Sequence, residues 1–202
     1  TMLKPSAPAD KFDTVGIPVI GFEVRILDES GQVLGSGEIG EIAGYGPGMM
    51  SAYHGRPNET SELIWQDERG RTFIRSGDIG CQDEDGYLKL VDRKKDMIIS
   101  GGENIYSTQV EAAIHQHPAV LESAVFGIPD DTWGEAVKAV VVLKPDQAAS
   151  AAEIIAVASE HLASYQKPKS VDFVAALPKA PTGKILKREL RDPYWQVQER
   201  SV

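Results

Sequence analysis

The chain has 202 residues, with 21 lysine and arginine residues against 30 aspartate and glutamate residues, a formal net charge of −9. This acidic balance argues against nonspecific binding to nucleic acid or to an anionic membrane. No apolar run approaches the roughly 20 residues of a membrane span, and no signal-peptide pattern opens the chain. The single cysteine, Cys81, has no second cysteine to pair with, which fits a reducing cytoplasm. Because the first residue is Thr1 rather than methionine, we interpret the chain as a piece of a longer polypeptide.

Short strands separated by turn residues are predicted over the first 92 residues. Alternating or continuous apolar patterns place these strands at residues 21–28, 37–42, 71–75 and 87–91. Regularly spaced short strands with turn signals between them are typical of an antiparallel barrel or sandwich. We therefore place a β-rich, distorted barrel-like lobe at residues 1–92.

The second lobe, residues 93–202, mixes helix and strand. Thr108 and Glu111 have the spacing of a capping box at the start of one helix, which Pro118 stops, and Ser150 begins a second capping box. Apolar runs predict buried strands at residues 120–126, 136–143 and 171–174. This order of elements predicts a small α+β domain in which helices flank a sheet, so the whole chain is of the α+β class.

Residues 91–105 join the two lobes. The segment passes through five consecutive charged residues, from Asp92 to Asp96, and then reaches the pair Gly101-Gly102. Five charged side chains cannot be buried together, so the segment is expected to lie in a crevice or to cross between the lobes. The glycine pair permits a sharp turn or a close backbone approach. Taken alone, this pattern favours a charged surface loop before a hairpin.

Two more stretches accompany this segment, residues 76–78 (Ser-Gly-Asp) and residues 178–184 (Pro-Lys-Ala-Pro-Thr-Gly-Lys). In this order and spacing, the three stretches resemble the C-terminal motifs of the adenylate-forming, AMP-binding superfamily, which contains acyl-CoA synthetases, peptide-synthetase adenylation domains and luciferases. The resemblance covers nearly the whole chain, but only the C-terminal portion of a family member. It implies ATP, a carboxylic acid and CoA as substrates, and Mg²⁺ held by a residue upstream. The phosphate-binding loop and the acid pocket would also lie upstream, so the chain alone is expected to be inactive.

Three residues are implied by the resemblance to serve the nucleotide half of the site. Asp78 would accept hydrogen bonds from the 2′ and 3′ hydroxyls of the ATP ribose, and Arg93 would contact the nucleotide with its guanidinium group. Lys95 occupies the family's hinge, about which the second lobe rotates between two half-reactions. From the residues alone, Asp78 could stabilise a tight turn and Lys95 could be merely solvated. Arg93 could form a weak surface ion pair with Asp92 or Asp96.

Lys184 is the expected catalytic residue. Formation of an acyl-adenylate brings a carboxylate to the α-phosphate of ATP, and a cation on a glycine-containing loop offsets the repulsion between the two anions. Without the resemblance, Lys184 would be an ordinary exposed lysine. The family also implies that a protein acetyltransferase and a deacetylase act on this lysine, because acetylation removes the ammonium charge.

Four residues are candidates for contact with CoA. In acid–CoA ligases that the chain resembles, the residue at Gly102 lines the tunnel for the pantetheine arm. Trp133, Tyr165 and Lys167 are further candidates, because aromatic rings and a cation could meet adenine and phosphate. The alternative for Trp133 is that it covers the core.

No metal-ligand pattern is found in the sequence. His115 and His117 lie two residues apart on a predicted helix, so they point in different directions. We therefore expect no metal site within this chain.

The motif at residues 97–105 favours an acid–CoA ligase, which activates a fatty or aryl acid as acyl-AMP and transfers it to CoA by domain rotation. A peptide-synthetase adenylation domain, which loads a carrier protein, is the alternative, although residues 102–105 depart from its usual Gly-x-Arg-Ile-Glu pattern. A luciferase-like oxygenase has no supporting residue. A non-catalytic binding or regulatory module is the alternative of another class, which intact Asp78, Arg93 and Lys184 disfavour. The particular acid cannot be inferred without its pocket.

Overall fold

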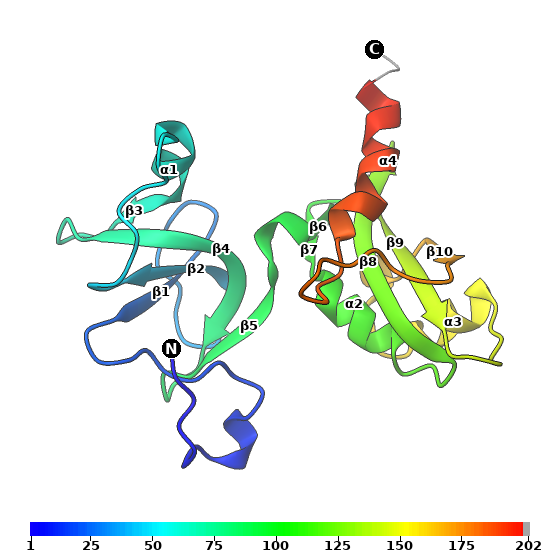
Figure 1. Cartoon of the computed structure of the whole chain (residues 1–202), viewed down its shortest axis with the longest axis horizontal. Coiled ribbons are helices and arrows are strands. Elements are labelled where there is room, and N and C mark those ends of the chain that lie inside the picture. The colour runs from blue at the N-terminus through cyan, green and yellow to red at the C-terminus, as the bar shows by residue number, and fades with distance from the viewer. Residues whose placement is uncertain (200–202) are drawn as a thin grey trace. The chain divides into compact units, whose positions relative to one another are not determined.

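The computed structural model describes residues 1–199, which form two compact units with a boundary between Lys95 and Asp96 (Figure 1). This boundary lies three residues after the one expected from the sequence. The assignment of the units to two parts of a larger enzyme stays a prediction.

The first unit is built on a five-stranded sheet in which every pair is antiparallel. Its strands are β1 (Glu23–Leu27), β2 (Gly40–Tyr45), β3 (Ile64–Gln66), β4 (Thr72–Gln82) and β5 (Leu88–Arg93). The helical segments are η1 (Ala9–Lys11), α1 (Pro57–Leu63) and, at the unit boundary, η2 (Lys94–Asp96). The strand order is β1-β2-β4-β3, and β5 pairs with the second half of β4. Among the described residues the sheet stays open, so the barrel-like closure expected from the sequence is not formed.

The core of the first unit forms where the alternating side chains of the strands meet. Phe73 is fully buried, and its ring packs against those of Tyr45 and Trp65 at centroid distances of 5.3 and 5.2 Å. Aromatic pairs at this spacing add to the stabilisation from burial alone. This packing explains why β3 forms beside β4, although the sequence did not predict β3 or α1.

The second unit has one sheet and three longer helices. Its elements are β6 (Ile98–Ser100), β7 (Glu103–Ile105), α2 (Ser107–Ile114), β8 (Val120–Asp130), β9 (Gly134–Leu143), α3 (Ala151–Ser159), η3 (Ser164–Gln166), β10 (Ser170–Phe173) and α4 (Lys187–Glu199). Strand β9 pairs with β8 and β6 in antiparallel orientation and with β10 in parallel orientation. The predicted α+β class is confirmed.

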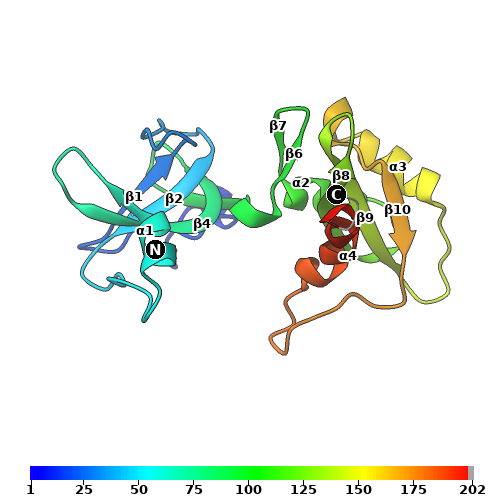
Figure 2. The ribbon, with the colours of Figure 1, turned by 90° about the horizontal axis from the view of Figure 1, so that it is seen from above.

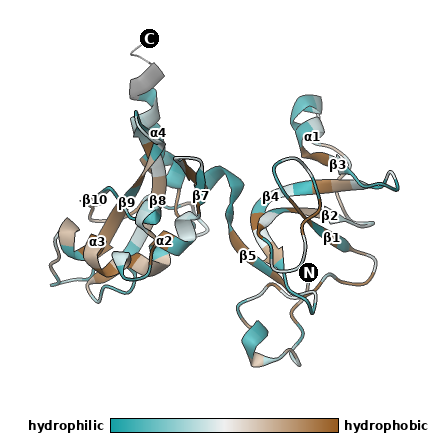
Figure 3. Ribbon diagram, turned by 180° about the vertical axis from the view of Figure 1, so that it is seen from behind, coloured by the Kyte–Doolittle hydropathy of each residue, from teal (hydrophilic) through white to brown (hydrophobic). Residues whose placement is uncertain are grey.

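Side chains alternate along β9 between the two faces of this sheet. Val137 and Val141 pack with α2 and α3, whereas Val140 and Val142 belong to a second cluster that α4 covers (Figure 2). The hydrophobic colour along much of β9 and the hydrophilic colour on much of α4 fit this arrangement, in which α4 contributes only a narrow apolar face (Figure 3). The sheet is therefore covered by helices on both faces.

One of the two predicted capping boxes is confirmed and the other is wrong. The Ser150 hydroxyl accepts from the Glu153 amide at 3.3 Å, and the Glu153 carboxylate accepts from the Ser150 amide at 2.7 Å. Helix α2, in contrast, begins one residue before Thr108, and its N-cap residue makes no side-chain capping bond. The Glu111 carboxylate instead accepts from the Val125 amide on β8. Glu111 thus accepts a hydrogen bond from a strand that is distant in the sequence, whereas its spacing had indicated a local capping bond.

Candidate functional site

Asp78 and Arg93 lie opposite each other on β4 and β5. Nε of Arg93 lies 2.6 Å from Oδ1 of Asp78 in an ion pair, and the side chains of Arg93 and Asp78 are 46% and 27% exposed. Gly77, at a φ of +73°, turns the chain just before Asp78, whose amide donates to the Ser76 hydroxyl at 3.1 Å. The ion pair of Arg93 is therefore formed with Asp78 rather than with a neighbour in sequence. The second carboxylate oxygen of Asp78 can still accept from a diol, and the terminal nitrogens of Arg93 can still donate. The pair therefore fits a ribose or a phosphate.

A buried carboxylate anchors the end of the first unit. Glu41 is 6% exposed, and its Oε2 accepts from Lys94 at 2.8 Å and from Arg75 at 3.2 Å. A buried carboxylate is stable only when it is paired in this way. Lys94 is thus tied to the first unit, and the next residue, Lys95, stands at the unit boundary. Sequence reasoning missed Glu41, and the hinge role of Lys95 stays a prediction.

Gly101 and Gly102 form the two-residue turn between β6 and β7. Their φ angles are +61° and +86°, which suit the type I′ turns that favour glycine at both positions. Trp133 lies against this turn. The Trp133 carbonyl oxygen accepts a hydrogen bond from the Gly101 amide at 2.8 Å. A Cβ atom added to Gly101 would lie only 2.8 Å from the Trp133 ring. A Cβ at Gly102 would meet nothing within 4 Å. Trp133 is 52% exposed, so it does not serve as a buried core residue. Two candidate CoA contacts therefore share one exposed surface.

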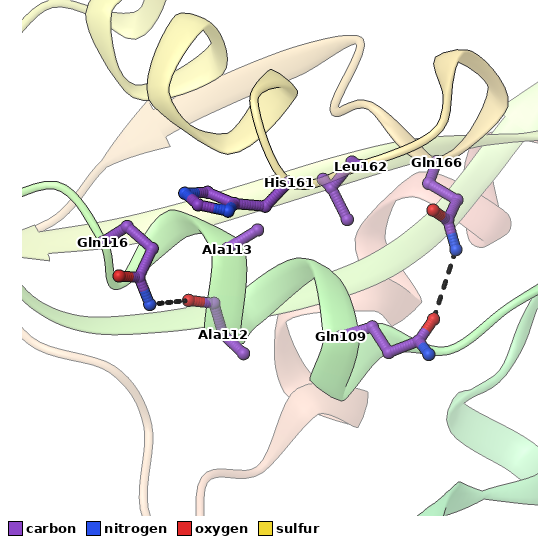
Figure 4. Close-up of a pocket in the computed structure, with 7 residues that line it drawn as sticks. All are labelled: Gln109, Ala112, Ala113, Gln116, His161, Leu162 and Gln166. Carbon is purple, nitrogen blue, oxygen red and sulfur yellow. Dashed lines mark hydrogen bonds between the residues drawn. The ribbon is translucent and has the colours of Figure 1, made fainter.

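Tyr165 lies on η3 and Lys167 directly follows it. The side-chain amide of Gln166, also on η3, donates to the side-chain oxygen of Gln109 on α2 at 3.2 Å. Beside this contact lies an open cavity of about 380 Å³ (Figure 4). It is lined by Gln109, Ala112, Ala113, Gln116, His161, Leu162 and Gln166. Neither Tyr165 nor Lys167 lines the cavity. The structure thus places Tyr165 and Lys167 at η3, and Gly102 and Trp133 at the turn between β6 and β7.

Lys184 closes a tight hairpin between β10 and α4. The Gly183 amide donates to the Ala180 carbonyl at 2.8 Å, and the Ala180 amide donates to the Lys184 carbonyl at 2.8 Å. Lys179 and Ile185 form an isolated antiparallel bridge at the base, and Gly183 has a φ of +83° that suits glycine. The Lys184 side chain is exposed at this turn. The backbone of the loop is therefore fixed, while the ammonium group is accessible.

Two titratable side chains near these elements, one half-buried and one buried, were not singled out from the sequence. Burial raises the pKa of Glu135, although the Ile99 amide, which donates to it at 3.3 Å, partly offsets this. Burial lowers the pKa of Lys138, but hydrogen bonds and charge interactions with Asp172 and Tyr194 together outweigh burial, so the pKa is raised overall. The ammonium of Lys138 lies 2.8 Å from that carboxylate and over the ring of Tyr194. These contacts join α4 to the sheet and leave the charge of Lys138 compensated.

Neither a metal centre nor a membrane span emerges from the residues that the structure describes. In residues 1–199 no three His, Cys, Asp or Glu side chains are grouped so that they could hold a metal ion. The helices of the same range are too short or too polar to cross a bilayer. No role is therefore assigned here to the Mg²⁺ that the resemblance implies.

Residues 109–184 match the family described as AMP-binding enzyme C-terminal domain. Feruloyl-CoA synthase from Amycolatopsis sp is 44% identical over 183 residues, which are 91% of this chain and 36% of that protein. The long-chain-fatty-acid–CoA ligase of Salmonella typhimurium is 42% identical over 179 residues, or 89% of this chain and 31% of that protein. The ATP-bound structure of MatB from Rhodopseudomonas palustris superimposes with a TM-score of 0.83 at 36% identity, covering 90% of this chain and 36% of that one. The chain thus spans about a third of the length of the relatives that it matches.

Proposed function

Because this chain belongs to the adenylate-forming (AMP-binding) family, with the enzyme C-terminal domain at residues 109–184, we propose that it is the C-terminal part of an acid–CoA ligase. The longer polypeptide that would contain it is the parent enzyme. The observation that carries the proposal is the exposed Lys184 on a backbone-closed hairpin, in a domain whose relatives are acid–CoA ligases. A cytoplasmic location, inferred from the lone Cys81, is part of this proposal.

In the first half-reaction, a carboxylate oxygen of a fatty or aryl acid attacks the α-phosphorus of ATP. Pyrophosphate leaves, and acyl-AMP is formed. Asp78 would accept from the ribose hydroxyls, while Arg93 keeps it oriented and donates to the nucleotide. The Lys184 ammonium would stabilise the negative charge that gathers on the phosphate oxygens. Mg²⁺ would supply further charge neutralisation from residues outside this chain.

In the second half-reaction, the CoA sulfur attacks the acyl carbon, AMP leaves, and the thiol proton is lost. The bare face at Gly102 leaves room for a narrow pantetheine arm, and the exposed ring of Trp133 beside it offers a stacking surface. Lys184 and Gly102 lie on different loops of one unit, the turn before α4 and the turn between β6 and β7. In this proposal each of them faces the acyl-phosphate centre in a different half-reaction. Rotation about Lys95 would exchange them.

Product analysis of the parent enzyme tests this proposal. Fatty and aryl acids are supplied with ATP and CoA, and the expected product is an acyl-CoA, detected by mass spectrometry. Acyl transfer to a carrier protein but not to CoA would favour the peptide-synthetase alternative. The absence of any product that depends on both ATP and an acid would favour a non-catalytic module.

Substitution of Trp133 by alanine in the parent enzyme should raise the KM for CoA by about tenfold, because stacking of an aromatic side chain on a nucleobase contributes roughly 1–3 kcal/mol. Adenylate formation should be unchanged. Leu121→Ala is the matched control, since Leu121 is an exposed apolar residue on β8 of the same unit. An unchanged KM for CoA in Trp133→Ala would remove Trp133 from the proposed CoA surface.

Acetylation of Lys184 is a further part of the proposal. An exposed ammonium on a fixed turn is accessible to a protein acetyltransferase, and acetylation would remove its charge where two anions must meet. Incubation of the 202-residue chain with acetyl-CoA and a bacterial protein acetyltransferase should modify Lys184 preferentially, as read by peptide mass spectrometry, and a deacetylase should reverse it. Acetylation spread evenly over the surface lysines would count against this regulation.

A further inference from the structure

Charged contacts with two different elements hold the base of the Lys184 hairpin. On its N-terminal side Lys179 forms an ion pair with Glu122 of β8. On its C-terminal side the Lys187 ammonium lies 2.7 Å from the Glu111 carboxylate and donates to the Ser107 hydroxyl at 2.7 Å, both on α2. The hairpin is thus attached to the sheet at one end and to a helix at the other.

The contact between Lys187 and Glu111 is shielded from solvent. The two side chains are only 15% and 19% exposed, and Ser107 is fully buried. The same oxygen of Glu111 also accepts from the Val125 amide at 2.8 Å, which links the pair to β8. In such surroundings, loss of one charge leaves the other poorly solvated, so the pair resists separation.

Apolar packing also holds the hairpin against the second unit. Leu177, just before the hairpin, is 5% exposed, and Ile185, just after Lys184, packs against the same core cluster. Lys187 comes three positions after Lys184, a span of at most about 11 Å of extended chain. Fixing Lys187 therefore restricts where the Lys184 backbone can lie relative to α2 and β8.

We propose that Lys187 and Glu111 are positioning residues for Lys184. Their ion pair fixes the hairpin on the second unit, so that Lys184 reaches the nucleotide through movement of the whole unit and not through rearrangement of its own loop. This role rests on the proposed function of Lys184, and it differs from a loop that reshapes at Gly183. Displacement of a catalytic lysine by even about 1 Å from its productive geometry can lower the rate of the reaction about 100-fold.

The kinetic test uses the parent enzyme with Lys187→Gln, which removes the charge but keeps a hydrogen-bonding side chain. The kcat of adenylate formation should fall about 10- to 100-fold, while the KM for ATP changes by less than about twofold. Thioester formation from preformed acyl-adenylate should also stay within about twofold, because Lys184 does not act in that step. Lys187→Arg, which keeps the charge, should recover most of the lost rate.

Arg188→Gln is the matched control. Arg188 lies on the same helix, one residue further on, but its side chain is 83% exposed and its ion pair with Asp192 is at the surface. Loss of such a pair has little effect on the fold, so all rates should remain within about twofold of the wild type.

Hydrogen exchange provides a second readout, independent of catalysis. In the 202-residue chain, Lys187→Gln should speed exchange of the Ala180 and Gly183 amides, which close the hairpin, and Arg188→Gln should not. If Lys187→Gln fails to fold, Glu111→Gln replaces it, because its amide oxygen can still accept from Val125.

Each outcome has a distinct meaning. If Lys184→Ala abolishes adenylation while Lys187→Gln leaves it within about twofold of the wild type, the positioning role is wrong and the proposed function stands. Equal loss of both half-reactions in Lys187→Gln would also contradict positioning, since a general fold defect does not discriminate between them. If Lys184→Ala itself leaves adenylation intact, the proposed function is wrong.

Discussion

Replacement of Lys184 by alanine in the parent enzyme is expected to lower adenylate formation by at least about 100-fold, because loss of one preorganised charge-stabilising donor typically costs 10²–10³ in kcat. Thioester formation from preformed acyl-adenylate should change by no more than about threefold. The reason is that a nucleophile attacks the α-phosphorus only in the first half-reaction, whereas the CoA sulfur attacks the acyl carbon in the second. Adenylation is measured as pyrophosphate release in a single turnover, and thioester formation as acyl-CoA produced from synthetic acyl-AMP.

Lys169→Ala is a suitable control for this substitution, since Lys169 is also an exposed lysine of the second unit and has no proposed role. Both half-reactions should proceed at wild-type rates in this variant. Equal loss of both half-reactions in Lys184→Ala would contradict its assignment to adenylation alone.

Replacement of Lys95 by proline should have the opposite effect. Lys95 lies in the short 3₁₀ turn η2, whose typical φ of −50 to −70° is within the range that proline adopts. Rotation at this position would be restricted, because proline fixes φ. We expect adenylate formation to stay within a few-fold of the wild type and thioester formation to fall by at least about tenfold.

Lys95→Ala separates the two possible causes of such a loss. Alanine removes the side chain but leaves φ free, so both half-reactions should remain close to wild-type rates. A loss of thioester formation in Lys95→Ala that matched the loss in Lys95→Pro would attribute the effect to the side chain and contradict the hinge.

Local patterns in the sequence predicted the elements whose stabilisation is itself local. Ser150 and Glu153 are close in sequence, and the capping box that they form needs nothing else. Helix α4 was missed because Pro193 and several charged residues obscure its periodicity, and its packing depends on Tyr194 and Leu190 contacting a distant sheet. Tertiary contacts of this kind override local propensity, and a single sequence does not display them.

The residues of the candidate site also divide into those that sequence motifs indicate and those that only tertiary contacts reveal. Asp78, Arg93 and Lys184 were named from motifs that resemble a family, whereas their local patterns alone indicated ordinary surface residues. Glu41 was not found, because it is 53 residues away from its partner Lys94 and no spacing rule connects them. The contact of Glu111 with Lys187 was hidden for the same reason, although Glu111 had been noticed for a capping role that it does not have.

Acid-dependent exchange of pyrophosphate into ATP is the measurement that tests the central claim most directly. The comparison is between the parent enzyme, its Lys184→Ala variant and the 202-residue chain alone. We expect exchange in the parent enzyme, a loss of at least about 100-fold in the variant, and none from the chain alone, since the phosphate loop and the acid pocket are assigned to residues outside it. Robust exchange by the purified chain alone, or exchange in the parent enzyme that does not depend on Lys184, would contradict the account.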